Sequence, residues 1–295
     1  MNASPRSDNS NLVRRVTFAA VAIPLALIIV WYGGAPLVCL LAVAGALGAR
    51  ELYGLAERGG VRPARLPGVA GAALIPLLSY AAIAGVWGGE LVRAAWPYVV
   101  AVWLILVLVW ALGARAPDAR PLEAVSVTVL GTLYCGALPA FLLVIRHGQH
   151  PLKSWAGAWL VFYPLVVTWV CDTAAMFGGR AIGGPKLAPS ISPGKTRSGS
   201  IAGVLGALVM APLFGLVVFP RAGVTVGIGA LIVMAAVLGV VGQLGDLVES
   251  LFKREAGVKD SSTLIPGHGG VLDRLDSLYV VVPVAAVLYR LFGVI

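Results

Sequence analysis

The sequence predicts an all-α polytopic membrane protein, with about nine transmembrane helices and its polar loops on the cytoplasmic side. Composition is the first reason, because 59% of the 295 residues are hydrophobic and only 12% are charged. A typical soluble domain is about 45–50% apolar and about 25% charged. A soluble fold could not hide this much apolar surface from water, so lipid must be the main solvent of the chain.

Apolar stretches long enough to cross a bilayer recur along the whole sequence, and each crossing needs roughly 20 residues of helix. The first stretch follows Arg14 and Arg15 as the core of a signal peptide would. It is too long for that role and further spans follow, so we expect a retained signal anchor. The helices are expected near 14–32, 35–56, 67–87, 95–113, 122–145, 157–178, 200–219, 224–250 and 271–292.

The distribution of positive charge predicts the orientation of these helices. With the N-terminus inside, most of the 22 Lys and Arg residues fall on the cytoplasmic side, a bias typical of membrane proteins. This orientation puts the two most polar loops, 179–199 and 251–270, on that same side. The basic runs 58–65 and 115–120 are interpreted as topology anchors that also touch anionic lipid headgroups. The basic residues expected on the outer side are Arg93, Arg146, Lys153, Arg221 and Arg290.

More than half of the 13 acidic residues lie in the second half of the chain, several of them inside or at the ends of apolar spans. An ionisable residue in such a place is costly and usually belongs to a site or a pathway. The three cysteines are far apart in apolar segments, so neither a disulfide framework nor a zinc site is expected. The acids in question are Asp172, Asp246, Glu249, Glu255, Asp260, Asp273 and Asp276.

The most polar segment of the chain covers residues 250–277. At its start, Asp246, Ser250 and Lys253 share one face of the expected helix, at i, i+4 and i+7. Residues 266–270 read Pro-Gly-His-Gly-Gly, which cannot be regular helix, and the glycines let backbone N–H groups approach an anion closely. The candidates for contacts with a phosphate here are His268, Gly269 and Gly270.

Acids and bases alternate in the same segment. Asp273 and Asp276 are three residues apart, so they share one face in the first turn of the last expected helix. With Asp246 they could converge on a divalent cation, and oxygen ligands of this kind suit Mg²⁺, which also takes substrate phosphates. Acids for a metal beside bases for phosphates is the composition that nucleotidyl transfer needs. The competing interpretation is a solvated loop with favourable helix-dipole pairing. The surrounding basic residues are Lys253, Arg254, Lys259 and Arg274.

A second polar loop follows the apolar span that ends near Asp172. Its Gly-Lys-Thr sequence at 194–196 imitates the end of a P-loop, but Pro189 stands where that pattern needs glycine, and no parallel sheet is expected. We expect Ser192, Lys195 and Thr196 to contact phosphates, and Asp172 to be an ion ligand or to orient a basic residue. The competing interpretation is a Pro/Gly-rich connector.

These motifs resemble those of the phosphatidate cytidylyltransferases, also called CDP-diacylglycerol synthases. The similar region covers roughly residues 172–277, and the chain departs from the family pattern at Met176, Arg197 and Ser198. The family signature, S-x-hydrophobic-K-R, then K-D, then P-x-H-G-G-hydrophobic-x-D-R-hydrophobic-D, is matched by Ser250, Lys253, Arg254, Lys259, Asp260, Pro266, His268, Gly269, Gly270, Asp273, Arg274 and Asp276.

The resemblance implies that CTP and phosphatidate react to give CDP-diacylglycerol and pyrophosphate, with Mg²⁺ as cofactor, at the cytoplasmic face of the cell membrane. It implies a single membrane domain in which residues 1–155 are scaffold helices and 156–295 the catalytic region. A homodimer is implied, and no nucleic-acid partner. The implied catalytic residues are Asp246, Lys253, Asp260, His268, Asp273, Arg274 and Asp276. Substrate contacts would come from Ser192, Lys195, Thr196, Ser250, Arg254, Lys259, Gly269 and Gly270. The metal ligands would be Asp246, Asp273, Asp276 and Asp172.

Other functions remain open from the residues themselves. A CDP-alcohol phosphatidyltransferase would need a D-G-x-x-A-R…G-x-x-x-D-x-x-x-D pattern, and the spacing of Asp273 and Asp276 does not provide it. A CTP-dependent lipid kinase would use similar loops. An ion-coupled transporter would explain acids in helices, but it would not explain a Gly-His-Gly-Gly loop beside clustered charges.

Overall fold

The protein is almost entirely α-helical in the computed structural model, which describes residue 20, residues 23–265, residue 267 and residues 269–295. Within this part, seven helices are long and apolar enough to cross a membrane, which confirms an all-α polytopic membrane protein. They correspond to the expected spans from 35–56 to 224–250. Their bounds are Gly34–Arg58 (α2), Arg65–Ala84 (α3), Gly89–Ala114 (α4), Pro117–His147, Trp155–Ile182 (α7), Arg197–Arg221 and Ile228–Glu255 (α10).

Two of the long helices contain a π-helical turn. Each π turn ends two residues before a proline, Pro139 in one helix and Pro220 in the other. A proline has no N–H for the regular i→i−4 pattern, so the chain accommodates it with one wider turn. The first of these helices consists of η1 (Pro117–Ala119), α5 (Pro121–Thr132), η2 (Leu133–Ala137) and α6 (Leu138–His147). The second consists of α8 (Arg197–Leu213), η3 (Phe214–Val218) and α9 (Phe219–Arg221).

The two outermost expected helices differ from the others. The first is described as a short apolar helix, Ile23–Tyr32, and most of its expected N-terminal part lies outside the described residues. It is separated from α2 by Gly33, and the φ angles of Gly33 and of Gly34, the first residue of α2, are 70° and 57°. These angles favour glycine, and they explain the predicted boundary between the first two helices.

The expectation of one continuous last helix over 271–292 is wrong. The chain forms α11 (Leu272–Leu275) and then α12 (Leu278–Leu291). At the break, the carboxylate of Asp276 accepts a hydrogen bond from the N–H of Ser277 at 2.6 Å. The backbone pattern then restarts, because Val281 N–H donates to the Ser277 carbonyl at 3.0 Å. A short polar side chain has competed with the helix for a backbone donor.

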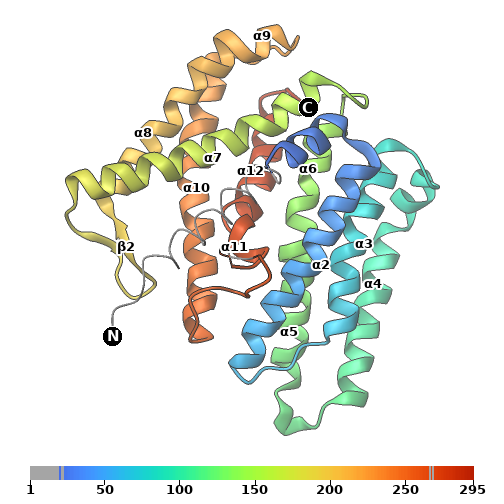
Figure 1. Cartoon of the computed structure of the whole chain (residues 1–295). Coiled ribbons are helices and arrows are strands. Elements are labelled where there is room, and N and C mark those ends of the chain that lie inside the picture. The colour runs from blue at the N-terminus through green and yellow to red at the C-terminus, as the bar shows by residue number, and fades with distance from the viewer. Residues whose placement is uncertain (1–19, 21–22, 266, 268) are drawn as a thin grey trace.

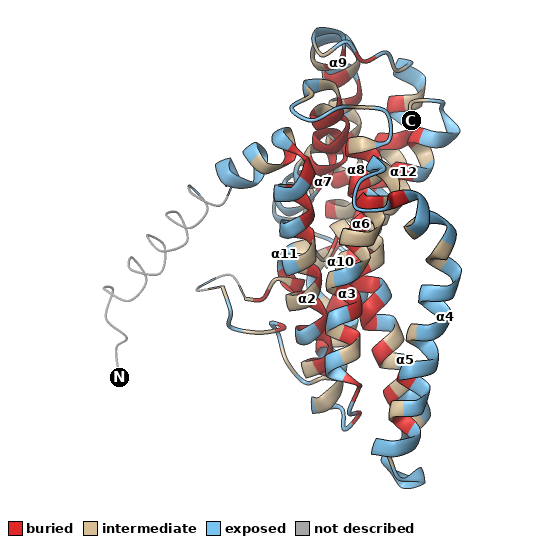
Figure 2. Cartoon of the chain, turned by 90° about the vertical axis from the view of Figure 1, so that its right-hand side faces the viewer, coloured by how far each residue is buried: buried red, intermediate tan, exposed pale blue. Residues whose placement is uncertain are grey.

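The helices form one assembly in which the N-terminal and C-terminal regions share a core (Figure 1). α12 packs against α6 and α10, and α11 against α2. One buried cluster joins Tyr53 of α2, Tyr134 of η2 and Tyr279 of α12. α4 lies at the edge and is exposed along most of its length (Figure 2). The two regions on either side of residue 155 therefore pack together. The expected division at that residue marks only where the predicted site residues begin.

A small β-hairpin connects α7 to α8. β1 (Lys186–Ala188) pairs antiparallel with β2 (Ser192–Thr196). The hairpin is closed by a hydrogen bond from Arg197 N–H to the Pro185 carbonyl at 2.9 Å. The hydroxyl of Thr196 accepts the N–H of Gly199 at 3.1 Å, which makes Thr196 the N-cap of α8.

Candidate functional site

The two polar loops meet beside the end of α10. Lys195 of β2 forms an ion pair with Asp246 of α10, with 2.5 Å between Nζ and Oδ2. Arg254, at the end of the same helix, donates from Nε to the carbonyl of Ile191 in the hairpin at 3.1 Å. Segments more than 50 residues apart in sequence are thereby brought together, as expected if both loops serve one site.

Two further carboxylates, those of Asp172 and Asp276, lie near this ion pair. Asp246 and Asp276 both act electrostatically on Asp172 of α7, and Asp246 acts on Asp276. α10 approaches the break between α11 and α12 closely, since a Cβ at Gly245 would lie 2.9 Å from the carbonyl oxygen of Asp276. Lys195 partly offsets the charge of all three acids. The group therefore carries more negative than positive charge, and a cation would relieve the repulsion.

Asp273 belongs to a different set of contacts. Its Oδ1 accepts from Lys253 Nζ at 2.7 Å. Its Oδ2 accepts three hydrogen bonds, from the N–H and hydroxyl of Ser261 at 2.8 and 2.7 Å and from Gly270 N–H at 2.8 Å. Lys253 also pairs with the fully buried Glu249 at 2.9 Å. Both oxygens of Asp273 are thus engaged by the protein, and a metal ion at Oδ1 would share that oxygen with Lys253.

Glu51 of α2 forms hydrogen bonds with the loop between α10 and α11, residues 256–271, called the signature loop below. The sequence analysis did not identify Glu51. Its Oε1 accepts the hydroxyl of Ser262 at 2.7 Å. Its Oε2 lies 3.0 Å from the hydroxyl of Ser261, whose single proton is shared with Asp273 Oδ2. The two oxygens of Glu51 also accept the N–H groups of Val271 and Leu272, at 3.1 and 2.8 Å, at the start of α11. Glu51 is 7% exposed. The signal was present, because Glu51 is an acid inside an expected apolar span, as Asp172 is.

The glycines of the signature loop make room for these two carboxylates. A Cβ at Gly269, whose φ is 81°, would lie 2.7 Å from Asp273 Oδ2. A Cβ at Gly270 would overlap both Ser261 and Glu51. A backbone N–H of this loop, that of Gly270, does approach an anion, but the anion is the protein's own Asp273 carboxylate. Contacts of these glycines with a substrate phosphate remain a prediction.

The remaining predicted residues are placed as follows. Ser250 donates to Asp246 at 3.3 Å, and Ser192 begins β2. Thr196 is largely buried as the cap of α8, so its predicted phosphate contact competes with that role. His268 lies outside the described residues. The exposed residues Lys259, Asp260 and Arg274 have no side-chain hydrogen bond or ion pair to the part of the chain that is described.

Residues at two of the three positions that depart from the family pattern stabilise the hairpin. Ser198 donates a short hydrogen bond to the carbonyl of Gly183 and lies 3.1 Å from the Thr196 hydroxyl. Arg197 closes the hairpin through its backbone. Met176 lies exposed on α7. These departures therefore leave the ion pair between Lys195 and Asp246 intact.

The donor set fits a magnesium ion that is completed by substrate. Among the described residues, no group of three or more His, Cys, Asp or Glu side chains is arranged to hold a metal ion. Mg²⁺ is commonly bound by one or two carboxylates together with phosphates and waters. Asp246 and Asp276 supply two carboxylates that interact with each other. Each of them accepts fewer contacts from the protein than Asp273 does, although Asp246 is itself paired with Lys195.

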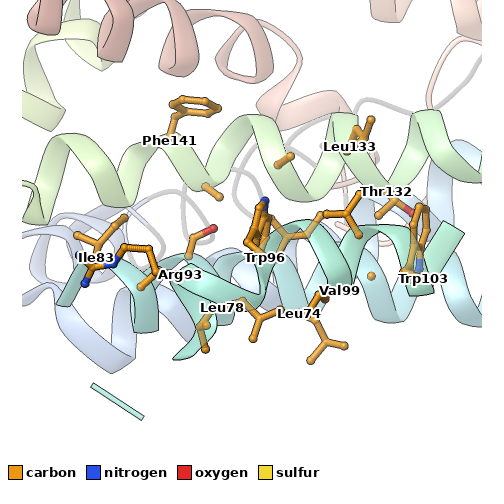
Figure 3. A pocket seen from close by; sticks show the side chains of 18 of the residues that line it. Leu74, Leu78, Ile83, Arg93, Trp96, Val99, Trp103, Thr132, Leu133 and Phe141 are labelled. Carbon is orange, nitrogen blue, oxygen red and sulfur yellow. The ribbon is translucent and has the colours of Figure 1, made fainter. Parts of the chain in front are cut away.

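A larger cavity than any at the polar loops described above lies elsewhere, between α3, α4 and the helix from α5 to α6 (Figure 3). Its volume is about 610 Å³, and Leu74, Trp96, Val99 and Phe141 are among its mostly apolar lining residues. Such a cavity in a membrane-spanning chain suits an acyl chain. It has no group that could act on a phosphate except Arg93 at its edge, so it is not the candidate site.

The fold and the site together define the class of the protein. It is a multi-pass membrane protein in which acids and bases from two polar segments meet at one site that is suited to anions. The Cytidylyltransferase family model matches residues 13–292. The chain therefore belongs to the cytidylyltransferase family.

Named relatives cover about half of the chain. Proteins named phosphatidate cytidylyltransferase from Haemophilus influenzae and Brucella suis are 44% identical over 153 residues and 45% identical over 165 residues. One from Bacillus subtilis is 40% identical over 171 residues. These matches cover 51%, 56% and 58% of this chain, and 52%, 56% and 60% of the relatives. The chain thus spans about half the length of the curated relatives it matches.

Proposed function

We propose that the protein transfers the cytidylyl group of CTP to phosphatidate, giving CDP-diacylglycerol and pyrophosphate. The observation that carries the proposal is the ion pair between Lys195 and Asp246, which joins the hairpin to α10, the helix in which the signature segment begins. The names of the relatives agree with this reaction. The proposed role in the cell is phospholipid biosynthesis.

The reaction needs no nucleophile from the protein. A phosphate oxygen of phosphatidate forms a bond to the α-phosphorus of CTP, and the bond from that phosphorus to the bridging oxygen of pyrophosphate breaks. The main barrier is repulsion between anions, which fixed positive charges and positioning lower. Lys259 and Arg274, exposed and without a side-chain partner among the described residues, are suited to contact the phosphates. Lys195 is suited to hold the nucleotide over the site.

Mg²⁺ is part of this proposal. Asp246 and Asp276 would hold it, with Asp172 nearby to strengthen the negative field. The ion would neutralise charge on the triphosphate. Asp273 would then serve the site by fixing Lys253 and the signature loop. Its direct binding to the metal, expected from the sequence, would use Oδ1, the oxygen that also accepts from Lys253.

We place the site at the cytoplasmic face, where water-borne CTP meets a lipid in the membrane. The positive charge of the loops at this end supports that orientation. A homodimer remains a prediction, and light scattering of the purified protein in detergent would test it. Labelling of cysteines introduced at Lys259 and Arg221, with a reagent that cannot cross the membrane, would test the orientation.

The deciding experiment supplies CTP labelled at the α- or γ-phosphate to purified protein in detergent micelles with phosphatidate and Mg²⁺. The proposal expects the α-label in lipid and the γ-label in pyrophosphate, each dependent on phosphatidate. A lipid kinase would put the γ-label into lipid. A CDP-alcohol phosphatidyltransferase or a transporter would leave CTP intact, and any of these results would overturn the proposal.

A further inference from the structure

A second pocket lies beside the signature loop, on the α2 side. Its volume is about 340 Å³. Leu47, Arg50, Gly54 and Arg58 line it from one face of α2, and they are separated by three or four residues as a helix face requires. The opposite wall is residues 261–264 of the signature loop. Neither the proposed chemistry nor the predicted site residues account for this pocket.

The pocket has positive charge that the protein does not use. Arg65, which also lines it, is held by Glu57, with 2.6 Å between Nε and Oε1. Arg50 and Arg58 are exposed, and within the described residues neither side chain has a hydrogen bond or an ion pair. Between them, a Cβ at Gly54 would meet nothing within 4 Å. The two arginines are therefore free to close on a ligand over an open stretch of α2.

The shape and chemistry of the lining match a phosphate that carries an apolar tail. Arginine presents planar donors that fit phosphate oxygens in pairs. The hydroxyl of Thr263 is exposed at the same pocket, and Leu47 and Leu264 add apolar surface. An anion alone would not need the two leucines. Because the pocket lies at the polar end of membrane-spanning helices, lipid headgroups are the phosphates that reach it at the highest local concentration.

The pocket is joined to the candidate site by hydrogen bonds. Glu51 and Ser261 line it. The Ser261 hydroxyl lies 3.0 Å from Glu51 and 2.7 Å from Asp273. Asp273 in turn holds Lys253. A ligand that packs against residues 261–264 would therefore contact the same loop that positions Asp273 and α11.

We propose that this pocket binds the phosphate headgroup of an anionic lipid, with the phosphate between Arg50 and Arg58 and the glycerol end against Leu47 and Leu264. The lipid is either phosphatidate that is about to react or a non-reacting anionic lipid that stabilises the loop. The inference rests on the proposed function, because it assigns part of the substrate or lipid recognition of the same site.

The test compares an Arg50→Gln/Arg58→Gln double variant with the wild-type protein. Arg62→Gln is the matched control, because Arg62 is an exposed arginine of the same basic run that does not line the pocket. The first measurement is binding of phosphatidate to delipidated protein in neutral detergent without CTP or Mg²⁺, with phosphatidylcholine for comparison. Removing two charge-assisted contacts should weaken binding by about tenfold or more. The control removes only part of the general attraction of the basic run for anionic lipid, so it should change binding much less.

The second measurement separates the two lipid sources. If reacting phosphatidate is the ligand, the double variant raises KM for phosphatidate by about tenfold and leaves KM for CTP unchanged. If a non-reacting lipid is the ligand, KM for phosphatidate stays constant and stimulation by added phosphatidylglycerol is lost.

Unchanged lipid binding with neither kinetic effect would overturn the proposal, as would a rise in KM for CTP alone or an equal effect of Arg62→Gln. Absence of phosphatidate-dependent pyrophosphate release from the wild-type protein would instead count against the proposed function. The binding measurement would still judge the pocket in that case, because it needs no turnover.

Discussion

A buried charged side chain lies at each of two opposite ends of the helices. Each forms hydrogen bonds with unpaired backbone groups at the end of another helix. At one end Arg146 is fully buried and donates to the carbonyls of Val30 and Trp31, at 2.8 and 2.6 Å, where the helix Ile23–Tyr32 finishes. At the other end Glu51 accepts the first N–H groups of α11. A cation at a helix C-terminus and an anion at a helix N-terminus are both favourable.

The two ends differ in what lies beyond the charge. Around Arg146 the partners are backbone carbonyls, including Pro151 at 3.0 Å, and burial together with the charge of Arg146 lowers the pKa of neighbouring His150. Beyond Glu51 the contacts continue through Ser261 to Asp273 and Lys253. The contacts of Arg146 end at backbone carbonyls and serve stability alone. The contacts of Glu51 continue to Asp273 and Lys253, so they can couple the position of the signature loop to the charged site.

The largest expected effect is on turnover, from Asp246→Asn. This variant removes a carboxylate from the group that holds Lys195 and the proposed Mg²⁺, so kcat should fall by about 100-fold or more. Thermal stability should be retained, because the repulsion with Asp276 is also reduced. Pyrophosphate release over a range of Mg²⁺ concentrations measures the effect. The control is Asp118→Asn, which changes an exposed acid in η1, and wild-type turnover of Asp246→Asn would contradict the assignment.

Arg146→Met should have the largest effect on stability. It leaves several buried carbonyls without a donor, each costing about 1–3 kcal/mol, so we expect a loss of about 3 kcal/mol or more. Thermal unfolding in detergent measures it, with the exposed Arg290→Met as control. KM values and turnover of the folded protein should not change. A selective loss of turnover would mean that this end also serves the site.

Glu51→Gln should lower stability less and turnover more. Glutamine keeps the shape but replaces one acceptor with a donor, so at least one N–H of α11 loses its partner, at about 1–3 kcal/mol. Limited proteolysis should show a more accessible signature loop, and kcat should fall because Asp273 and Lys253 lose their support. The control is Glu123→Gln, in an exposed pair with Arg120. If Glu51→Gln lowered stability without lowering turnover, Glu51 would have the same purely structural role as Arg146.

The smallest effect is expected from Thr196→Val. Loss of the N-cap of α8 should cost about 1 kcal/mol, and Thr196→Ser should retain the cap. Thermal unfolding and KM for CTP are measured on both variants. If the hydroxyl also contacts a phosphate, as the sequence predicts, Thr196→Val raises KM for CTP and Thr196→Ser does not. An unchanged KM in both variants would limit Thr196 to its structural role.

The parts of the structure that could be predicted depend on local pattern. Lipid requires continuous apolar helices with satisfied backbone groups, so hydropathy locates the spans directly. The meeting of the two polar loops followed from helix count and charge. The site was predicted less well. Spacing places Asp273 and Asp276 on one face, but it does not indicate which protein groups each acid contacts. Lys253, Ser261 and Gly270 engage Asp273, whereas Asp276 accepts the N–H of Ser277.

Glu51 shows what sequence pattern alone could not provide. It contacts Ser261 across 210 residues of sequence, and no periodicity within α2 indicates that partner. The cost of an acid in an apolar span was a sufficient reason to examine it. The same reasoning, applied evenly to both halves of the chain, would have marked Glu51 together with Asp172.

The short length of α12 has a consequence for the surrounding bilayer. Its 14 residues rise about 21 Å, whereas the hydrocarbon core of a bilayer is about 30 Å thick. A membrane that matched α12 alone would become thinner or admit water near Asp276. The protein would then carry its own local defect in the leaflet, and a lipid phosphate could meet a water-borne partner with little displacement from its own monolayer.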